Sequence, residues 1–267
     1  MSETEQAPVG VDPTIPSVAR IYDYYLEGKD NFASDRAVGD RILSMVPEMR
    51  QLARDNRAFL GRAVRHLAAS GITQFLDIGT GLPTQENVHQ VALAANPDAK
   101  IVYVDNDPIV LVHARALLAD NPNTTVLAGD LHDPKAILDA AAEHLDFTKP
   151  VAVILAAILH FIPDDDETYR IVGDLRARLA PGSILAISHI YAGGYDPDVV
   201  QEGESEYGKT ATGSVTIRNL AEISRYAEGL TLLEPGIAPA DAWRPEHDEV
   251  EIDLVKPSCL CMVGTVE

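Results

Sequence analysis

The first residues of this sequence that could do chemistry form a turn that combines an acid with glycines. Asp77, Gly79, Thr80 and Gly81 follow a short apolar run and precede a stretch with helical spacing. Glycine lets the backbone turn tightly and approach a ligand closely, and ligands of open α/β sheets bind at the carboxyl ends of the strands. The pattern favours a nucleotide-binding turn, and a turn with glycines for purely steric reasons is the alternative.

An acid also ends the second predicted strand. Asp105 occupies a position from which a carboxylate can accept hydrogen bonds from both hydroxyls of a ribose. Asn106 and Asp107 would line the same edge. Because Asp107 directly precedes Pro108, we expect it to cap the next helix rather than bind the ligand.

Gly129, Asp130 and Leu131 follow the third predicted strand. The Asp130 carboxylate could reach the amino group of an adenine, while Leu131 could offer a backbone N–H and an apolar wall. As an alternative, Asp130 is a loop or capping residue. Acids at three strand ends together predict a ligand that contains adenosine.

The fourth predicted strand ends in small residues followed by a histidine. Ala156 would leave room for a ligand, and His160 is the candidate catalytic residue, because imidazole titrates near neutral pH and could act as a general base. A structural role at the approach to the next helix is equally compatible with His160. His189, at the end of the fifth predicted strand, has a similar but weaker claim.

An aromatic segment near the N-terminus could close over the ligand. Tyr22 and Tyr25 lie three residues apart, on one face of a predicted helix, and Arg20 precedes them. Arg20 or a tyrosine hydroxyl could hold a carboxylate of the ligand. The alternative is an aromatic stripe that packs into the core.

Alternating elements position these residues. Apolar strands are predicted at Gln74–Ile78, Lys100–Asp105, Thr124–Ala128, Val151–Ala156 and Ser183–Ile190, with helices at 85–95, 108–120, 134–145 and 166–179 between them. Near-continuous apolar strands that alternate with helices indicate a parallel sheet covered on both faces. Leu230–Glu234 and Ser258–Val266 would add an antiparallel edge. The predicted fold is a Rossmann-like, doubly wound α/β fold with a mostly parallel seven-stranded sheet and an N-terminal helical extension.

The chain divides into unequal regions. Residues 1–13 are expected to be a disordered tail, and residues 14–70 a helical region that covers the ligand site, with helices at 17–28, 35–45 and 47–70. Residues 71–267 would form the main domain. Within it, residues 191–215 are rich in glycine and acids, which predicts a loop that acts as a lid, and residues 216–229 are predicted to be a helix.

The charge balance excludes some partners. The net charge is −20, from 41 acidic and 21 basic residues, which argues against nucleic acids and acidic membranes. The arginines of residues 50–65 are spaced like the solvated face of a helix.

Cys259 and Cys261 lie two apart, which suggests buried strand residues rather than a disulfide or metal site. The polar N-terminus lacks signal-peptide features, so a cytoplasmic location is expected.

Taken together, these motifs resemble the class I S-adenosylmethionine-dependent methyltransferases. More narrowly, the chain is similar to a bacterial family named for that methyltransferase fold, whose substrates are largely unassigned. The similarity extends from about Ser17 to the final strand and is carried by Arg20–Arg36, Phe75–Thr84, Val102–Pro108 and Leu155–Pro163. It implies S-adenosyl-L-methionine as the cofactor and methyl transfer as the reaction. The acidic charge balance, which argues against nucleic acids, favours a small-molecule acceptor.

Other functions and assemblies stay open. An NAD-dependent oxidoreductase would need a third glycine in the turn, where Pro83 and Thr84 stand instead, and a catalytic constellation that the sequence lacks. A catalytically silent protein that binds S-adenosylmethionine would leave no distinguishing motif, because methyl transfer depends mainly on positioning. The sequence is compatible with a monomer or a homodimer and with O-, N- or C-methylation.

Overall fold

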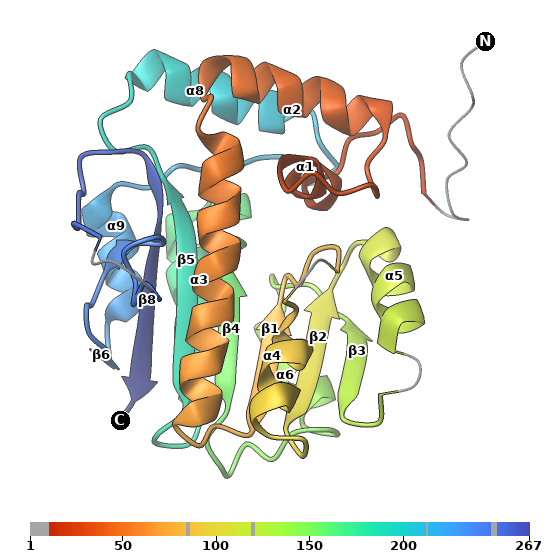
Figure 1. Ribbon diagram of the computed structural model, residues 1–267, viewed down its shortest axis with the longest axis vertical. Coiled ribbons are helices and arrows are strands. Elements are labelled where there is room, and N and C mark those ends of the chain that lie inside the picture. The colour runs from red at the N-terminus through yellow and green to blue at the C-terminus, as the bar shows by residue number, and fades with distance from the viewer. Residues whose placement is uncertain (1–10, 84–85, 119–120, 212, 247–249) are drawn as a thin grey trace.

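The computed structural model describes residues 11–83, 86–118, 121–211, 213–246 and 250–267 (Figure 1). A central sheet runs through the molecule with helices on both faces, and further helices lie across one end of the strands. Among the described residues the strand order is β3-β2-β1-β4-β5-β8-β6, and the short strand β7 also pairs with β8. The predicted fold class is confirmed, with β7 as an additional two-residue strand.

The five parallel strands lie where the sequence predicts them, within one residue. They are β1 (Gln74–Ile78), β2 (Lys100–Asp105), β3 (Thr124–Ala128), β4 (Ala152–Ala156) and β5 (Ile184–Tyr191). β1 pairs with both β2 and β4, so the strand order reverses between β1 and β4. In such sheets the reversal opens a crevice at the carboxyl ends of the strands.

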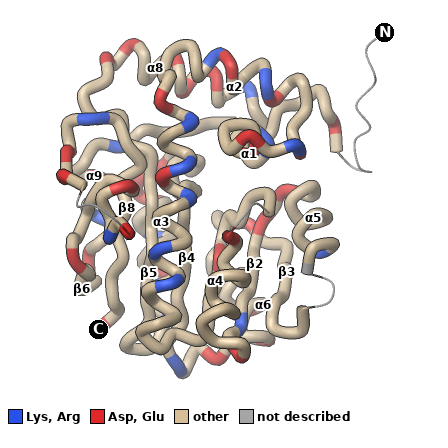
Figure 2. Tube along the Cα trace, in the orientation of Figure 1, with Lys and Arg blue, Asp and Glu red and all other residues tan. Residues whose placement is uncertain are grey.

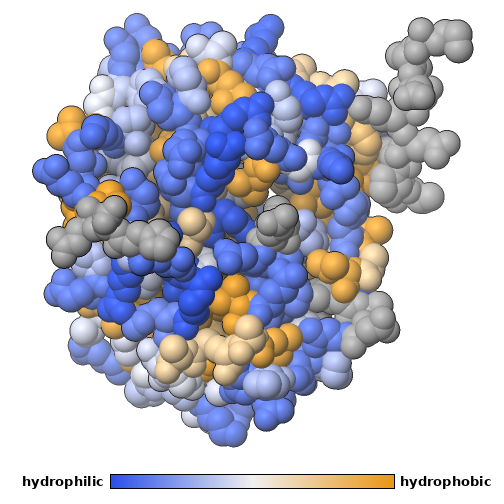
Figure 3. All heavy atoms as spheres, viewed as in Figure 1, coloured by the Kyte–Doolittle hydropathy of each residue, from blue (hydrophilic) through white to orange (hydrophobic). Residues whose placement is uncertain are grey.

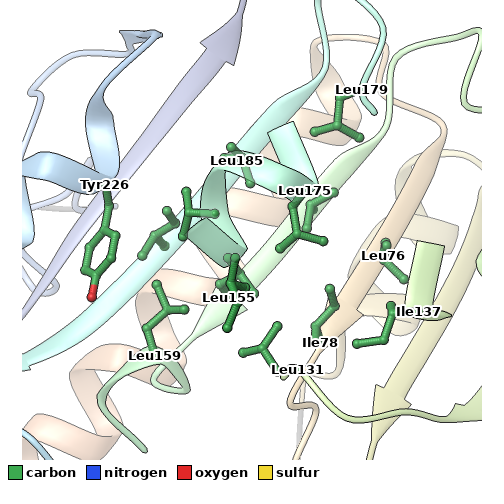
Figure 4. Close-up of a cluster of buried hydrophobic side chains, with 14 of the residues drawn as sticks. Leu76, Ile78, Leu131, Ile137, Leu155, Leu159, Leu175, Leu179, Leu185 and Tyr226 are labelled. Carbon is green, nitrogen blue, oxygen red and sulfur yellow. The ribbon is translucent and has the colours of Figure 1, made fainter. Parts of the chain in front are cut away.

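Alternating side chains of the strands build two apolar cores. On one face, Leu76 and Ile78 of β1 join a cluster with α6 (Pro134–Ala141) and α7 (Asp165–Ala177) (Figure 4). On the other face, Phe75 packs with α3 (Met49–Ala69) and α4 (Val88–Ala95). α4 begins later than predicted, because Asn87 caps it in a capping box. The Asn87 side chain accepts from the backbone N–H of Gln90, and the Gln90 side chain accepts from the backbone N–H of Asn87. α5 (Pro108–Leu118) follows β2.

The predicted N-terminal helices are present. α1 (Val18–Tyr25) and α2 (Ala33–Met45) cross the carboxyl ends of the strands, and α3 then runs along the sheet (Figure 1). Blue segments along α3 in Figure 2 mark its arginines. Residues 1–10 of the predicted disordered tail lie outside the described residues. Asp12 and Pro13 belong to a turn that is hydrogen-bonded to Thr14 and Ser34.

Two predictions for the C-terminal half are wrong. The predicted loop 191–215 contains α8 (Pro197–Tyr207), which begins because Asp196 caps it and Pro197 occupies its first turn. The predicted helix 216–229 is not helical before Leu220. Asn219 caps the short α9 (Leu220–Ser224), and η2 (Arg225–Ala227) follows. The remaining strands are β6 (Leu230–Leu232), β7 (Ala238–Pro239) and β8 (Ser258–Val266), all antiparallel to their partners.

The face of the molecule seen in Figure 3 is mostly hydrophilic with small apolar patches. Within the described residues, no helix combines the length and the apolar character that a membrane span requires. In the same part of the chain, no three His, Cys, Asp or Glu side chains are grouped to hold a metal ion.

Candidate functional site

A cavity of about 680 Å³ lies at the carboxyl ends of β1 to β5, next to α1 and the first half of α3. Its volume lies within the range of about 300–1,000 Å³ that is typical of small-molecule sites. It brings together all the candidate site residues of the sequence, which are Arg20, Tyr22, Tyr25, Asp77, Gly79, Thr80, Gly81, Asp105, Asn106, Asp130, Leu131, Ala156 and His160.

The turn after β1 needs its glycines for two different reasons. Gly79 and Gly81 have φ values of +75° and +66°, which L-residues with side chains rarely adopt. A Cβ at Gly79 would lie 2.5 Å from Cγ1 of Ile158, whereas a Cβ at Gly81 would meet no described atom within 4 Å. Gly79 therefore allows close packing of the turn against the loop after β4, and Gly81 leaves open space at the cavity.

Asp105 is held in place by the backbone of the turn. Its Oδ2 accepts from the Gly81 N–H and its Oδ1 from the Asp107 N–H, each at 2.9 Å. Burial raises the pKa of Asp105, and these hydrogen bonds oppose the rise. Asp107 caps α5 through the Ile109 N–H, as predicted, and also accepts from the Ser17 hydroxyl at 2.7 Å.

Asp77 is the most perturbed acid of the cavity wall. The residue is only 4% exposed, and this burial raises the pKa of its carboxyl group to about 7. Arg57 of α3 opposes the rise, and the nearby Asp105 adds to it. Asp77 thus changes charge in the physiological pH range.

Asp130 and Leu131 also face the cavity. Oδ1 of Asp130 accepts from the His132 N–H at 3.0 Å, so the acid also stabilises its own loop. Leu131 is buried and belongs to the core on the α6–α7 face of the sheet. The loop therefore presents an acid beside an apolar wall, as the sequence predicts.

The N-terminal wall is fixed by a buried ion pair. Nε of Arg20 donates to Oδ2 of Asp35 at 2.8 Å, and the arginine also donates to the Ile15 carbonyl. Asp35 in addition accepts from the backbone N–H groups of Ser17 and Phe32, at 2.9 and 2.7 Å. One carboxylate thus ties the start of α1 to the start of α2.

Both tyrosines of the N-terminal segment are engaged by the protein itself. Tyr22 donates to the Ala53 carbonyl and accepts from Nδ2 of Asn56, each at 3.0 Å. The hydroxyls of Tyr25 and Tyr207 lie 3.5 Å apart. The hydroxyl proton of Tyr22 is therefore directed at α3, which leaves it unable to donate to a ligand carboxylate.

His160 lies in η1 (Leu159–Phe161), the loop after β4, and is almost fully buried. Burial, followed by the proximity of His189 and Arg218, holds the pKa of His160 well below 6.5. The Ile190 N–H donates to Nδ1 of His160 at 3.4 Å, which leaves the ring proton on Nε2. His160 is therefore a neutral imidazole throughout the physiological range.

Arg218 organises the loop that carries His160. It is 1% exposed and donates to Oδ1 of Asp165, to the Leu159 and Ile162 carbonyls and to Nε2 of His189, at 2.8, 3.3, 2.9 and 3.2 Å. Burial and the nearby arginine lower the pKa of His189 to about 3, so this ring is also neutral. His189 acts as an acceptor within the core.

Several further residues line the cavity that the sequence did not indicate, above all those of α3. Arg57 lines the cavity, although the arginines of this helix were expected to be solvated. Oδ1 of Asn56 accepts from the Ser188 hydroxyl at 2.6 Å and from the Cys259 thiol at 3.4 Å. The available signal was Asn56 itself, which lies between Ala53 and Leu60 on the apolar face of the helix. Cys259 and Cys261 are free and buried, as predicted.

Comparisons with known proteins agree with this geometry. The family model described as S-adenosyl methyltransferase matches residues 4–266. A crystal structure of a protein provisionally classed as a methyltransferase, from Thermobifida fusca YX, is 39% identical, with a TM-score of 0.91 and coverage of 99% of this chain and 100% of that one. A DUF574 family protein from Streptomyces avermitilis MA-4680 is also 39% identical, with a TM-score of 0.87 and coverage of 96% of this chain and 99% of that one. No curated protein matches the chain.

Proposed function

Because the chain belongs to the S-adenosyl methyltransferase family and is thus an S-adenosylmethionine-dependent methyltransferase, we propose that its acceptor is a small molecule bound in the cavity described above. The observation that carries this proposal is the continuity of the cavity. It extends from the acids at the ends of β1, β2 and β3 to the apolar side chains over β4, β5 and β8. Cofactor and acceptor can therefore occupy adjacent halves of one continuous cavity.

The residues over β1 to β3 fit the cofactor. Gly81 leaves room where a side chain would stand, and Asp105 presents a half-buried carboxylate whose position is fixed by two backbone N–H groups. We propose that Asp105 and Asn106 bind the ribose, that Asp130 and Leu131 bind the adenine, and that Gly79–Gly81 allow close approach of the backbone. The charge of Asp77 would attract the cationic end of the cofactor.

The remaining residues would position and enclose the reactants. When bound, S-adenosylmethionine would supply an activated methyl group, whose bond to the acceptor forms as the carbon–sulfur bond breaks, leaving S-adenosylhomocysteine, while the proton that the uncharged acceptor loses passes to solvent. Such a displacement depends chiefly on alignment and on exclusion of water. Arg20 and Ala156 would shape the wall between the two halves, and α1, α2 and α8 would cover the acceptor. Tyr22 and Tyr25 would contribute through packing.

His160 is the proposed contact for the reacting end of the acceptor. Its depressed pKa makes it a weak base, so we propose that it orients the acceptor by donating from Nε2 rather than by taking up a full proton. Replacing His160 by Phe is expected to lower kcat roughly tenfold, the cost of one lost hydrogen bond, while leaving cofactor affinity unchanged. Single-turnover assays and calorimetry would measure the two quantities. An equal loss of cofactor affinity would place His160 in the cofactor half instead.

The ribose contact can be tested without knowing the acceptor. Asp105→Ala is expected to weaken binding of S-adenosylhomocysteine by about 1–3 kcal/mol, because it removes the acceptor of buried hydrogen bonds. Isothermal titration calorimetry measures this loss, with the exposed Asp98→Ala as a matched control that retains wild-type affinity. Unchanged affinity in folded Asp105→Ala would remove this residue from the site.

Turnover tests the proposed function as a whole. Purified protein with S-adenosylmethionine and a panel of uncharged metabolites is expected to form S-adenosylhomocysteine with at least one of them, and NAD is expected not to bind. Cofactor binding without turnover on small molecules, but with turnover on a protein or nucleic acid, would contradict the proposed acceptor class.

A further inference from the structure

The two halves of the cavity differ in chemistry. The strand-end acids Asp77, Asp105 and Asp130 belong to the half over β1 to β3. The other half is lined chiefly by apolar and aromatic side chains, among them Phe161 and Ile190. Arg20, Asp23 and Arg57 also line the cavity, but they already make hydrogen bonds to Asp35, Asn31 and Asn87. A charged group in the apolar half would therefore lose its hydration and would have to compete for these partners. This half therefore favours an uncharged ligand.

A second, smaller cavity adjoins this apolar half. It has a volume of about 60 Å³ and shares four wall residues with the main cavity, namely Met49, Leu52, Ile190 and Tyr207. From this shared wall it extends between α2 and α8, where Ile42, Val200 and Gly203 line it. It is several times larger than the space that one water molecule needs, and apolar cavities of this kind take up apolar molecules in preference to water.

Gly203 accounts for part of this space. It lies inside α8, where glycine is less favourable than alanine. A Cβ at this position would meet no described atom within 4 Å, so close packing of the helix does not require glycine here. The missing side chain instead leaves open the smaller cavity that Gly203 lines.

We propose that the acceptor is an uncharged molecule with an apolar arm. Its reacting end lies beside His160, and its arm passes between Met49 and Tyr207 into the smaller cavity between α2 and α8. This inference rests on the proposed methyl transfer to a small molecule and specifies the chemistry of that acceptor. Met49 has a flexible, unbranched side chain, which suits a contact that must adjust to the arm.

Graded binding tests the proposal. Calorimetry on protein saturated with S-adenosylhomocysteine would compare phenol, 4-ethylphenol and 4-butylphenol, with 4-hydroxybenzoate as an anionic probe. We expect affinity to rise about threefold to fourfold for each methylene that becomes buried, and 4-hydroxybenzoate to bind at least tenfold more weakly than 4-ethylphenol.

Gly203→Leu is expected to abolish the dependence on chain length, because its side chain fills the smaller cavity. It should leave the affinities for phenol and S-adenosylhomocysteine unchanged. Gly173→Leu on α7 is the matched control, since Gly173 is also inside a helix, has open space at its Cβ and lines neither cavity. If Gly203→Leu fails to fold, Val200→Phe fills the same space from the preceding turn.

Several results would overturn the inference. For the wild-type protein, these results are equal affinities for phenol and 4-butylphenol, no binding of any neutral phenol, or tight binding of 4-hydroxybenzoate. For Gly203→Leu, the contradicting result is an affinity that still rises with the chain length of the phenol. Binding of S-adenosylhomocysteine separates this outcome from a failure of the proposed function. A wild-type protein that does not bind S-adenosylhomocysteine contradicts the function, whereas normal cofactor binding with a flat phenol series contradicts the acceptor class alone.

Discussion

Asp77→Asn is expected to stabilise the ligand-free protein at pH 8 by up to about 4 kcal/mol while weakening binding of S-adenosylmethionine roughly tenfold. The stabilisation follows from the pKa of Asp77, which rises from 3.8 to about 7 on folding because the carboxyl group is buried. The amide of asparagine has nearly the same shape and carries no charge to desolvate. The loss of affinity follows from removing the negative charge that faces the cationic cofactor.

The sign of the pH dependence makes this prediction specific. The folded state holds the Asp77 proton more tightly than the unfolded state does. The contribution of Asp77 to the free energy of unfolding of the wild-type protein is therefore most favourable below pH 4 and is lost as the pH rises to about 7. The advantage of Asp77→Asn should therefore be largest above pH 7 and shrink towards zero near pH 4. Urea unfolding at several pH values measures it. A difference in stability that does not change with pH would show that Asp77 is not protonated in the folded protein.

Asp35→Ala is expected to lower the free energy of unfolding by about 3–5 kcal/mol. Asp35 is fully buried, and its loss would leave the 3%-exposed Arg20 without its carboxylate. Removing one partner of a buried ion pair costs far more than the pair itself contributes, because an uncompensated charge stays in the interior. The N–H groups of Ser17 and Phe32 would lose their acceptor as well.

Urea unfolding compares this variant with Asp40→Ala, which removes an exposed carboxylate from the same helix and should cost less than about 1 kcal/mol. Adding Arg20→Met to Asp35→Ala should recover part of the loss, since no buried charge is then left unpaired. Equal losses for Asp35→Ala and Asp40→Ala would mean that water reaches Arg20 in solution.

The sequence contained enough information for the parallel sheet and for the position of the cofactor half. Apolar runs such as Val102 to Val104 define strands, and residues at or just after the carboxyl ends of parallel strands lie at the same edge of the sheet. Asp77, Asp105 and Asp130 could therefore be placed together without a structure. Asp107 could be assigned to capping because the residue before a proline at a helix start is a local signal.

Contacts between distant segments could not be predicted in this way. The segment before α9 is not helical, and within it the buried Arg218 donates to Asp165 and His189, which lie 53 and 29 positions earlier in the chain. The helical periodicity of residues 216–229 gives no indication of these long-range contacts. The arginines of α3 likewise have the spacing of a solvated face, and only the packed structure directs Arg57 into the cavity.

Apolar residues of α1 and α2 form, with Met49 and Ala53 of α3 and Tyr207 of α8, a cluster that is distinct from the two clusters against the sheet. Structural units with separate cores can open individually, at a free energy below that of global unfolding. We therefore expect the N-terminal helices to open at a lower free energy than the sheet, while the strand-end acids keep their positions. Their frequency of opening would then limit how long a product stays enclosed, and substitutions in this cluster would alter residence time without touching the residues that hold the nucleoside.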